Sequence, residues 1–176
     1  DLEARLERLG YTSGHEPDSL ELSTLGGWIA TNASGMKKNR YGNIEDIVEQ
    51  VTLVTPRGVI EHSMPMPRVS MGMEPQQLAF GSEGNLGLIT RAIIRIHRLP
   101  EVKRYGSYVF RDFKTGADFL YDLSRAGVLP ASIRLVDNVQ FRFGQALKAR
   151  PTGQEKLMSR VQQTFLESVK GFDLRQ

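Results

Sequence analysis

The stretch that decides the fold is rich in glycine and hydroxyl side chains around one short apolar turn: Ser23-Thr24-Leu25-Gly26-Gly27-Trp28-Ile29-Ala30-Thr31-Asn32-Ala33-Ser34-Gly35. Either Ser23 or Thr24 can cap a helix, so a helical turn is predicted over 25–30. Glycines allow a ligand close to the backbone, and free N–H groups carry partial positive charge. The pattern is typical of a site that holds a pyrophosphate without Lys or Arg. A solvated loop is the alternative, but polar runs this long are uncommon unless they serve function.

A second glycine-rich stretch, Gly81-Ser82-Glu83-Gly84-Asn85-Leu86-Gly87-Leu88-Ile89, leads into a predicted strand over 88–98. The Rossmann fingerprint has the opposite order, because its loop follows a strand and opens a helix. The P-loop pattern Gly-x-x-x-x-Gly-Lys-Ser/Thr does not occur in the sequence. A P-loop NTPase and a Rossmann dehydrogenase are therefore both disfavoured, and a tight turn entering a strand is the plain alternative for this loop.

The composition indicates an ordinary globular chain. Of 176 residues, 40% are hydrophobic and 24% are charged, and 23 Lys and Arg against 20 Asp and Glu leave a net charge of +3. No apolar run approaches the roughly 18–20 residues of a membrane span. The basic residues are spread along the chain, which argues against a nucleic-acid partner. Without cysteine there is no disulfide framework and no thiolate metal site.

Titratable residues that could take part in chemistry are few. His15 precedes the first loop and is either a turn residue or a polar wall of a ligand site, whereas His62 and His97 are expected to be exposed at strand ends. No pair has the spacing of metal ligands, so no metal site is predicted. Arg134 is a lone cation in an apolar segment, and it either faces water or points into a cavity that takes an anion.

The remaining pattern predicts an α+β chain of two parts. The first part has a helix over 2–9, strands over 47–54 and 59–61 joined by the turn Thr55-Pro56-Arg57-Gly58, and helical turns over 74–80. The second part has a strand over 105–110, a helix over 115–126, a strand over 131–136 and an amphipathic helix over 157–169. We place the domains at 1–98 and 104–176, with a linker over 99–103.

Both ends of the chain look cut. Asp1 stands where a Met would begin a complete chain, and the last helical stripe runs out at 171–176 without a closing element. We expect an internal piece of a longer protein; a complete small domain with frayed ends is the alternative.

Several motifs closely resemble the alkyldihydroxyacetonephosphate synthase family, the flavoenzymes of ether-lipid synthesis. They are Asp18–Thr24, Gly26-Gly27-Trp28, Thr31–Gly35, Lys37-Lys38-Asn39, Tyr41–Asp46, Thr55–Gly58, Ala131–Leu135 and Gly171-Phe172-Asp173. The pattern Gly81-Ser82-Glu83-Gly84-x-Leu86-Gly87-x-Ile89-Thr90 is shared more widely, across FAD-binding domains of the vanillyl-alcohol oxidase/p-cresol methylhydroxylase (PCMH) type. The run from Trp28 to Asp46 resembles the synthases more specifically.

The resemblance implies the second half of a PCMH-type FAD-binding domain, followed by the beginning of an α/β cap domain that covers the substrate. It implies FAD as the cofactor and assigns catalytic positions to His15 and Arg134. The residues that it assigns to FAD binding are Asp18, Ser19, Leu20, Glu21, Leu22, Ser23, Thr24, Thr31, Asn32, Ala33, Ser34, Glu83, Gly84, Asn85, Leu86, Gly87, Leu88 and Ile89.

The reaction implied by the resemblance exchanges the acyl chain of acyl-dihydroxyacetone phosphate for a long-chain fatty alcohol. It proceeds through an adduct at flavin N5 without net oxidation, so the chemistry needs an acid/base and a cation for the substrate phosphate. The resemblance further implies a peroxisomal homodimer that meets the membrane through regions outside this chain. The chain would hold one wall of the cofactor pocket, so we expect the isolated 1–176 chain to bind FAD weakly or not at all and to be inactive.

Two other functions are weighed against this one. An FAD-linked oxidase or dehydrogenase of 2-hydroxy acids shares the loop over 81–89 but lacks the motif over 28–46. A non-catalytic binding fragment would use the two polar loops as a protein interface instead.

Overall fold

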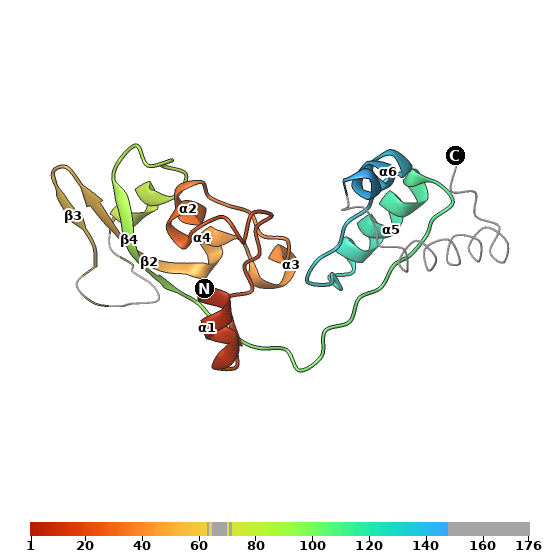
Figure 1. The fold of residues 1–176 in the computed structure, drawn as a ribbon, viewed down its shortest axis with the longest axis horizontal. Helices are drawn as coiled ribbons and strands as arrows, with labels where there is room; N and C mark the ends of the chain where they lie inside the picture. The colour runs from red at the N-terminus through yellow and green to blue at the C-terminus, as the bar shows by residue number, and fades with distance from the viewer. Residues whose placement is uncertain (63, 65–69, 71, 148–176) are drawn as a thin grey trace. The chain divides into compact units, whose positions relative to one another are not determined.

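The computed structural model describes residues 1–62, 64, 70 and 72–147, so the predicted helix over 157–169 and the motif at 171–173 lie outside the described residues. The chain divides into two compact units, residues 1–108 with 121–133 and residues 109–120 with 134–176. Figure 1 shows the helices and strands of both. Helices and an antiparallel sheet occur together, as the predicted α+β class requires.

A three-stranded antiparallel sheet of order β3-β2-β4 is the centre of the first unit. Its strands are β2 (Val48–Thr55), β3 (Gly58–Ile60) and β4 (Leu88–Ile94). The predicted turn closes the β2–β3 hairpin, with Thr55 directly opposite Gly58 and the Thr55 hydroxyl donating to the Gly58 carbonyl at 2.8 Å. A second pairing, β1 (Tyr11–Thr12) with β5 (His97–Arg98), was not anticipated from the sequence.

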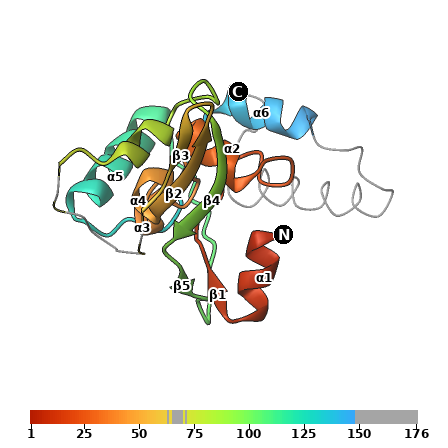
Figure 2. The same cartoon turned by 90° about the vertical axis from the view of Figure 1, so that its left-hand side faces the viewer.

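Two short helices pack against one face of this sheet, as Figure 2 shows. Helix α2 (Leu25–Ala30) has the bounds that the sequence predicts, and helix α4 (Ile44–Ile47) begins at a capping box made by Asn43 and Asp46. Ile29, Val51 and Ile44 are buried in the core between them. Each such side chain contributes about 1.5–3 kcal/mol through its burial.

The open edge of β2 beyond the end of β3 is closed by a side chain. Gln76 lies on the 3-10 helix η1 (Pro75–Ala79), which begins at Pro75 as predicted. Its Oε1 accepts from the Val51 N–H at 3.0 Å, and its Nε2 donates to the Glu49 carbonyl at 3.3 Å. The amide therefore takes the place of a neighbouring strand and satisfies backbone groups that would otherwise be buried without partners.

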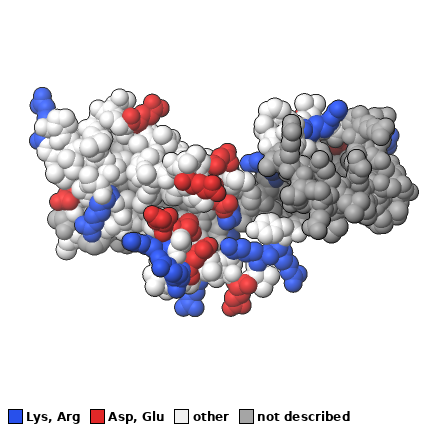
Figure 3. All heavy atoms as spheres, in the orientation of Figure 1, with Lys and Arg blue, Asp and Glu red and all other residues white. Residues whose placement is uncertain are grey.

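The remaining helices of the first unit are α1 (Leu2–Arg8), close to the predicted 2–9, and α3 (Lys38–Tyr41). None of the helices in the described part of the chain is both long and apolar enough to cross a membrane. On the face drawn in Figure 3, acidic and basic side chains are interspersed rather than separated.

Helices α5 (Phe113–Arg125) and α6 (Asn138–Ala146) account for the regular structure beyond residue 108 in the described chain. The strands predicted over 105–110 and 131–136 are wrong, since neither segment forms a strand. A strand needs a partner for its backbone groups, and the described residues provide none for these two. Residues 131–136 still alternate between half-buried and exposed, and Leu135 packs against Gly116 of α5.

Candidate functional site

Helix α2 brings the predicted site segments together. Thr24, the last residue of segment 18–24, caps the helix by accepting from the Gly27 N–H at 3.1 Å. Segment 31–34 leaves its other end, where the Ala33 N–H donates to the Trp28 carbonyl at 2.8 Å. The second loop lies alongside, because the Gly81 and Glu83 N–H groups donate to the carbonyls of Ile29 and Ala30 at 3.2 and 2.8 Å. The two glycine-rich loops are therefore neighbours in space.

The junction of these loops holds unusual backbone conformations. Asn32 and Glu83, with φ of 51° and 49°, are the non-glycine residues at positive φ within the described part of the chain. Gly81 and Gly84 are also left-handed, at 69° and 79°. Non-glycine residues in this region store strain, which is typical of functional sites. A Cβ on Gly84 would meet no atom within 4 Å, so this backbone is open to a ligand.

Several hydroxyls that were expected to face a ligand donate inside the protein instead. Ser23 donates to the Ser19 carbonyl at 2.6 Å and accepts from Trp28 Nε1 at 2.6 Å. Thr31 donates to the Gly27 carbonyl, and Ser34 donates to Asn43 Oδ1, both at 2.9 Å. Their predicted contacts with FAD stay predictions. Most backbone N–H groups of the two loops are engaged as well, since those of residues 31–33, 81–83 and 85 donate to carbonyls of the protein.

Most of the other predicted cofactor residues are accessible. In the first loop, Leu22 is 93% exposed; in the second, Leu88 is 72% exposed and Leu86 is 45% exposed. Exposed apolar side chains of this kind are more stable in contact with a flat, apolar ring than in contact with water. Ser82 adds a buried Oγ that has no hydrogen-bond partner among the described residues.

His15 is a buried imidazole. Its side chain is 2% exposed, its ring packs at 5.3 Å from the Trp28 ring, and both ring nitrogens lack a hydrogen-bond partner within the described residues. Burial lowers the pKa of His15, against the charges of Glu45 and Glu3, which raise it. The imidazole is therefore neutral at pH 7.

The two residues with predicted catalytic positions belong to different units. His15 lies in the first unit, and Arg134 lies in the second, where it is exposed. His97, expected to be exposed, is half-buried with its ring 5.0 Å from that of Tyr41.

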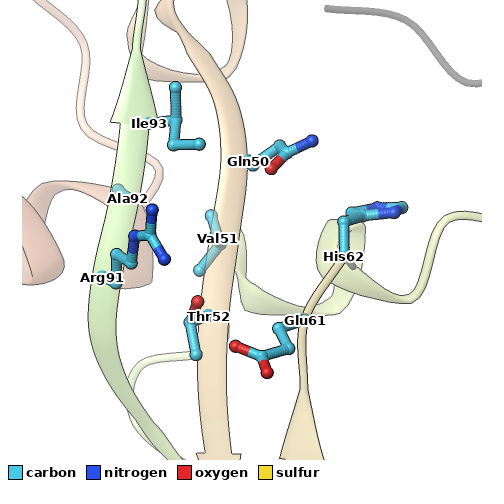
Figure 4. Close-up of a pocket in the computed structure, with 8 residues that line it drawn as sticks. All are labelled: Gln50, Val51, Thr52, Glu61, His62, Arg91, Ala92 and Ile93. Atoms are coloured by element: carbon cyan, nitrogen blue, oxygen red, sulfur yellow. The ribbon is translucent and has the colours of Figure 1, made fainter. Parts of the chain in front are cut away.

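A small hollow on the sheet lies apart from the residues predicted for the site. Its volume is about 70 Å³, and Figure 4 shows its walls on β2, β4 and the segment after β3. Arg91 and Glu61 both extend toward Thr52 there. Since ligand pockets are typically about 300–1,000 Å³, this hollow is too small for a dinucleotide.

Comparison with known proteins gives the class. The family model described as "FAD binding domain" matches residues 1–63, and the one described as "FAD linked oxidases, C-terminal domain" matches residues 99–170. The chain is therefore part of an FAD-linked protein, with an FAD-binding domain followed by the C-terminal domain of FAD-linked oxidases. FAD is the cofactor of this class.

Within that class the chain belongs to the alkyldihydroxyacetonephosphate synthase family. It is 49% identical over 172 residues to the alkyldihydroxyacetonephosphate synthase of Caenorhabditis elegans, covering 97% of this chain and 29% of the relative. The synthase of Trypanosoma brucei brucei is 37% identical, over 99% of this chain and 28% of its own length. A solved synthase structure matches 99% of this chain and 30% of its own at 32% identity, with a TM-score of 0.77. The chain thus spans less than a third of these relatives.

The residues fit FAD on the structure's own evidence. The left-handed backbone at Gly81 and Gly84 leaves a surface that a Cβ on Gly84 would extend into, and the buried Ser82 hydroxyl beside it has no partner among the residues that the structure describes. An extended diphosphate is commonly bound by the backbone N–H groups of turns that contain left-handed residues. Segments 31–34 and 83–89 would hold it, with Leu86 and Leu88 beside the ring system.

Proposed function

We propose that this chain forms one wall of the FAD site in an alkyl transferase of ether-lipid synthesis. The reaction exchanges the acyl chain of acyl-dihydroxyacetone phosphate for a long-chain fatty alcohol, without net oxidation. The observation that supports the proposal most is the meeting of both glycine-rich loops on α2, in a chain 49% identical to a relative named as such a synthase.

Each group of residues has a distinct part in this proposal. When bound, the reduced flavin supplies an electron-rich nucleophile. The open, left-handed backbone at Gly84 binds the diphosphate, while Leu86 and Leu88 exclude water from the ring. His15 holds or accepts a proton at a ring nitrogen, since its lowered pKa keeps it neutral at pH 7. Arg134, always charged, binds the phosphate of the substrate.

The proposal extends to the setting of the whole protein. We infer a homodimer, a peroxisomal location and contact with the membrane through parts of the protein outside this chain. Fractionation of cells that express the tagged full-length protein tests the location. Recovery in the cytosolic fraction would contradict it.

The activity is tested on the full-length protein, supplied with acyl-dihydroxyacetone phosphate and radiolabelled hexadecanol. The expected product carries the labelled alkyl chain, and the flavin shows no net turnover of reducing equivalents. If D-lactate or glycolate reduces the flavin and no labelled alkyl product forms, the protein is an FAD-linked oxidase of 2-hydroxy acids instead.

A pair of glycine variants tests the assigned FAD wall. Gly84 and Gly10 share a φ of 79°, and a Cβ at either position would meet nothing within 4 Å. Gly84→Ala and Gly10→Ala therefore carry a similar backbone strain, about 1–2 kcal/mol. We expect Gly84→Ala to lower the FAD content of the purified full-length protein, with Gly10→Ala keeping it. Equal FAD content in the two variants would show that this loop is not part of the FAD site.

A further inference from the structure

The carboxylate of Glu3 on α1 is bonded to the segment that leads to His15. One oxygen, Oε2, accepts from the Thr12 hydroxyl at 2.8 Å. The other, Oε1, accepts from the Ser13 N–H at 3.0 Å and from the Ser13 hydroxyl. Hydrogen bonds to a charged acceptor are about twice as strong as neutral ones. We call Glu3, Thr12 and Ser13 the Glu3 bridge.

Each hydroxyl of the Glu3 bridge also accepts a hydrogen bond from further along the chain. Thr12 Oγ1 accepts from the Gly14 N–H at 3.0 Å, and Ser13 Oγ accepts from the His15 N–H at 3.2 Å. Each hydroxyl directs its proton to the carboxylate, so the lone pairs of each hydroxyl oxygen remain available to accept from these N–H groups. One carboxylate oxygen thus holds the backbone of Gly14 through the Thr12 hydroxyl. The other holds the backbone of His15 through the Ser13 hydroxyl.

The space around the His15 ring leaves little tolerance for a shift of that backbone. The Trp28 ring lies on one side, 5.3 Å between centroids. On another, a Cβ on Gly35 would come within 2.8 Å of His15 Nδ1. Within the Glu3 bridge, Ser13 is buried at 1% exposure, and Glu3 and Thr12 are half-buried.

We propose that Glu3 is a positioning residue for His15, acting through Ser13 and Thr12 to set where the imidazole lies. This inference rests on the proposed function, in which His15 handles a proton. The charge of Glu3 also acts on the ring: together with Glu45 on α4, it raises the pKa of His15 against the lowering by burial. The neighbouring Glu16 is paired with Lys37.

Glu3→Gln in the full-length protein tests the proposal, with Glu7→Gln as the matched control. Glu7 lies on the same helix and is exposed. Two properties are measured: kcat with labelled hexadecanol, and the rate of deuterium exchange at Cε1 of His15 against pH, read by mass spectrometry of its peptide. The second measurement needs no activity, and its midpoint reports the pKa of His15.

We expect Glu3→Gln to lower kcat by about tenfold to a hundredfold, the cost of a misplacement near 1 Å. The exchange midpoint of His15 shifts to lower pH, because a nearby negative charge is lost. FAD content stays unchanged, and Glu7→Gln matches the wild type. A purely structural role would lower the yield or the unfolding temperature without moving the midpoint of the folded protein.

Midpoints and kcat that are equal in Glu3→Gln and Glu7→Gln would overturn the proposal. If Glu3→Gln fails to fold, Thr12→Val removes one arm of the Glu3 bridge and Thr12→Ser keeps it; only Thr12→Val is expected to lower kcat, and equal kcat in the two is the overturning result. If the wild type lacks alkyl exchange, the proposed function fails while the midpoints still decide the role of Glu3.

Discussion

Gly87 provides the sharpest steric test of the second loop. A Cβ at this position would lie 2.3 Å from the Val54 carbonyl oxygen and 3.2 Å from the Thr55 Cα, and both atoms belong to the backbone of β2. No side chain can move aside to relieve the clash, so in Gly87→Ala the loop must withdraw by about 1 Å to restore ordinary contact. Overpacking of this kind costs about 1–3 kcal/mol.

The same withdrawal moves the loop amides away from a bound diphosphate. The free protein relieves the clash by this withdrawal, whereas FAD binding requires the loop in its original place. The cost then falls on the FAD-bound state, and the affinity for FAD drops by about 5-fold to 150-fold, at tenfold for each 1.4 kcal/mol. The assay is fluorescence titration of the full-length apoprotein with FAD, alongside its thermal unfolding. Gly144→Ala is the control, because a Cβ there meets nothing within 4 Å on α6 and replacing a helical glycine stabilises by about 0.5–1 kcal/mol. FAD affinity within twofold of the wild type in Gly87→Ala would refute the reasoning.

Three further predictions follow from the first unit. Gly35→Ala places a methyl 2.8 Å from His15 Nδ1 and displaces the ring, so alkyl exchange falls while bound FAD is retained; unchanged kcat would contradict this. Because the folded pKa of His15 lies below its ordinary 6.5, the unfolded state binds more protons, and stability falls as the pH drops from 6.5 through the folded pKa. A thermal unfolding series over pH shows this loss, and His15→Gln is expected to flatten it. Thr24→Ala removes the cap on the Gly27 N–H and costs about 1 kcal/mol in denaturant unfolding, and Thr24→Ser is expected to restore it.

The parts of the fold that depend on local sequence were predictable. The cap at Thr24 and the six apolar and small residues after it define α2, and the turn at 55–58 defines the β2–β3 hairpin. Both are decided by contacts within a few residues. The pairing of the two glycine-rich loops was expected only through the family resemblance, since their hydrogen bonds join residues about fifty positions apart.

Features that depend on distant partners were missed or mistaken. The apolar segment over 131–136, in which Arg134 is a lone cation, predicted a strand, but an apolar segment does not supply the partner that a strand requires. Asn is enriched in the left-handed region, but this tendency alone did not locate Asn32, and Glu83 carries no such signal. The link of His15 to Glu3 arises from α1 packing against β1, and the burial of its ring involves Trp28 and Gly35.

The central claim is that segments 31–34 and 83–89, side by side on α2, hold FAD. Amide hydrogen–deuterium exchange of the full-length protein, with and without FAD, measures this segment by segment. The account predicts slower exchange over 31–34 and 83–89 when FAD is bound, with residues 91–93 beside the small hollow unchanged. Protection confined to 50–52 and 91–93, with both loops unaffected, would contradict it.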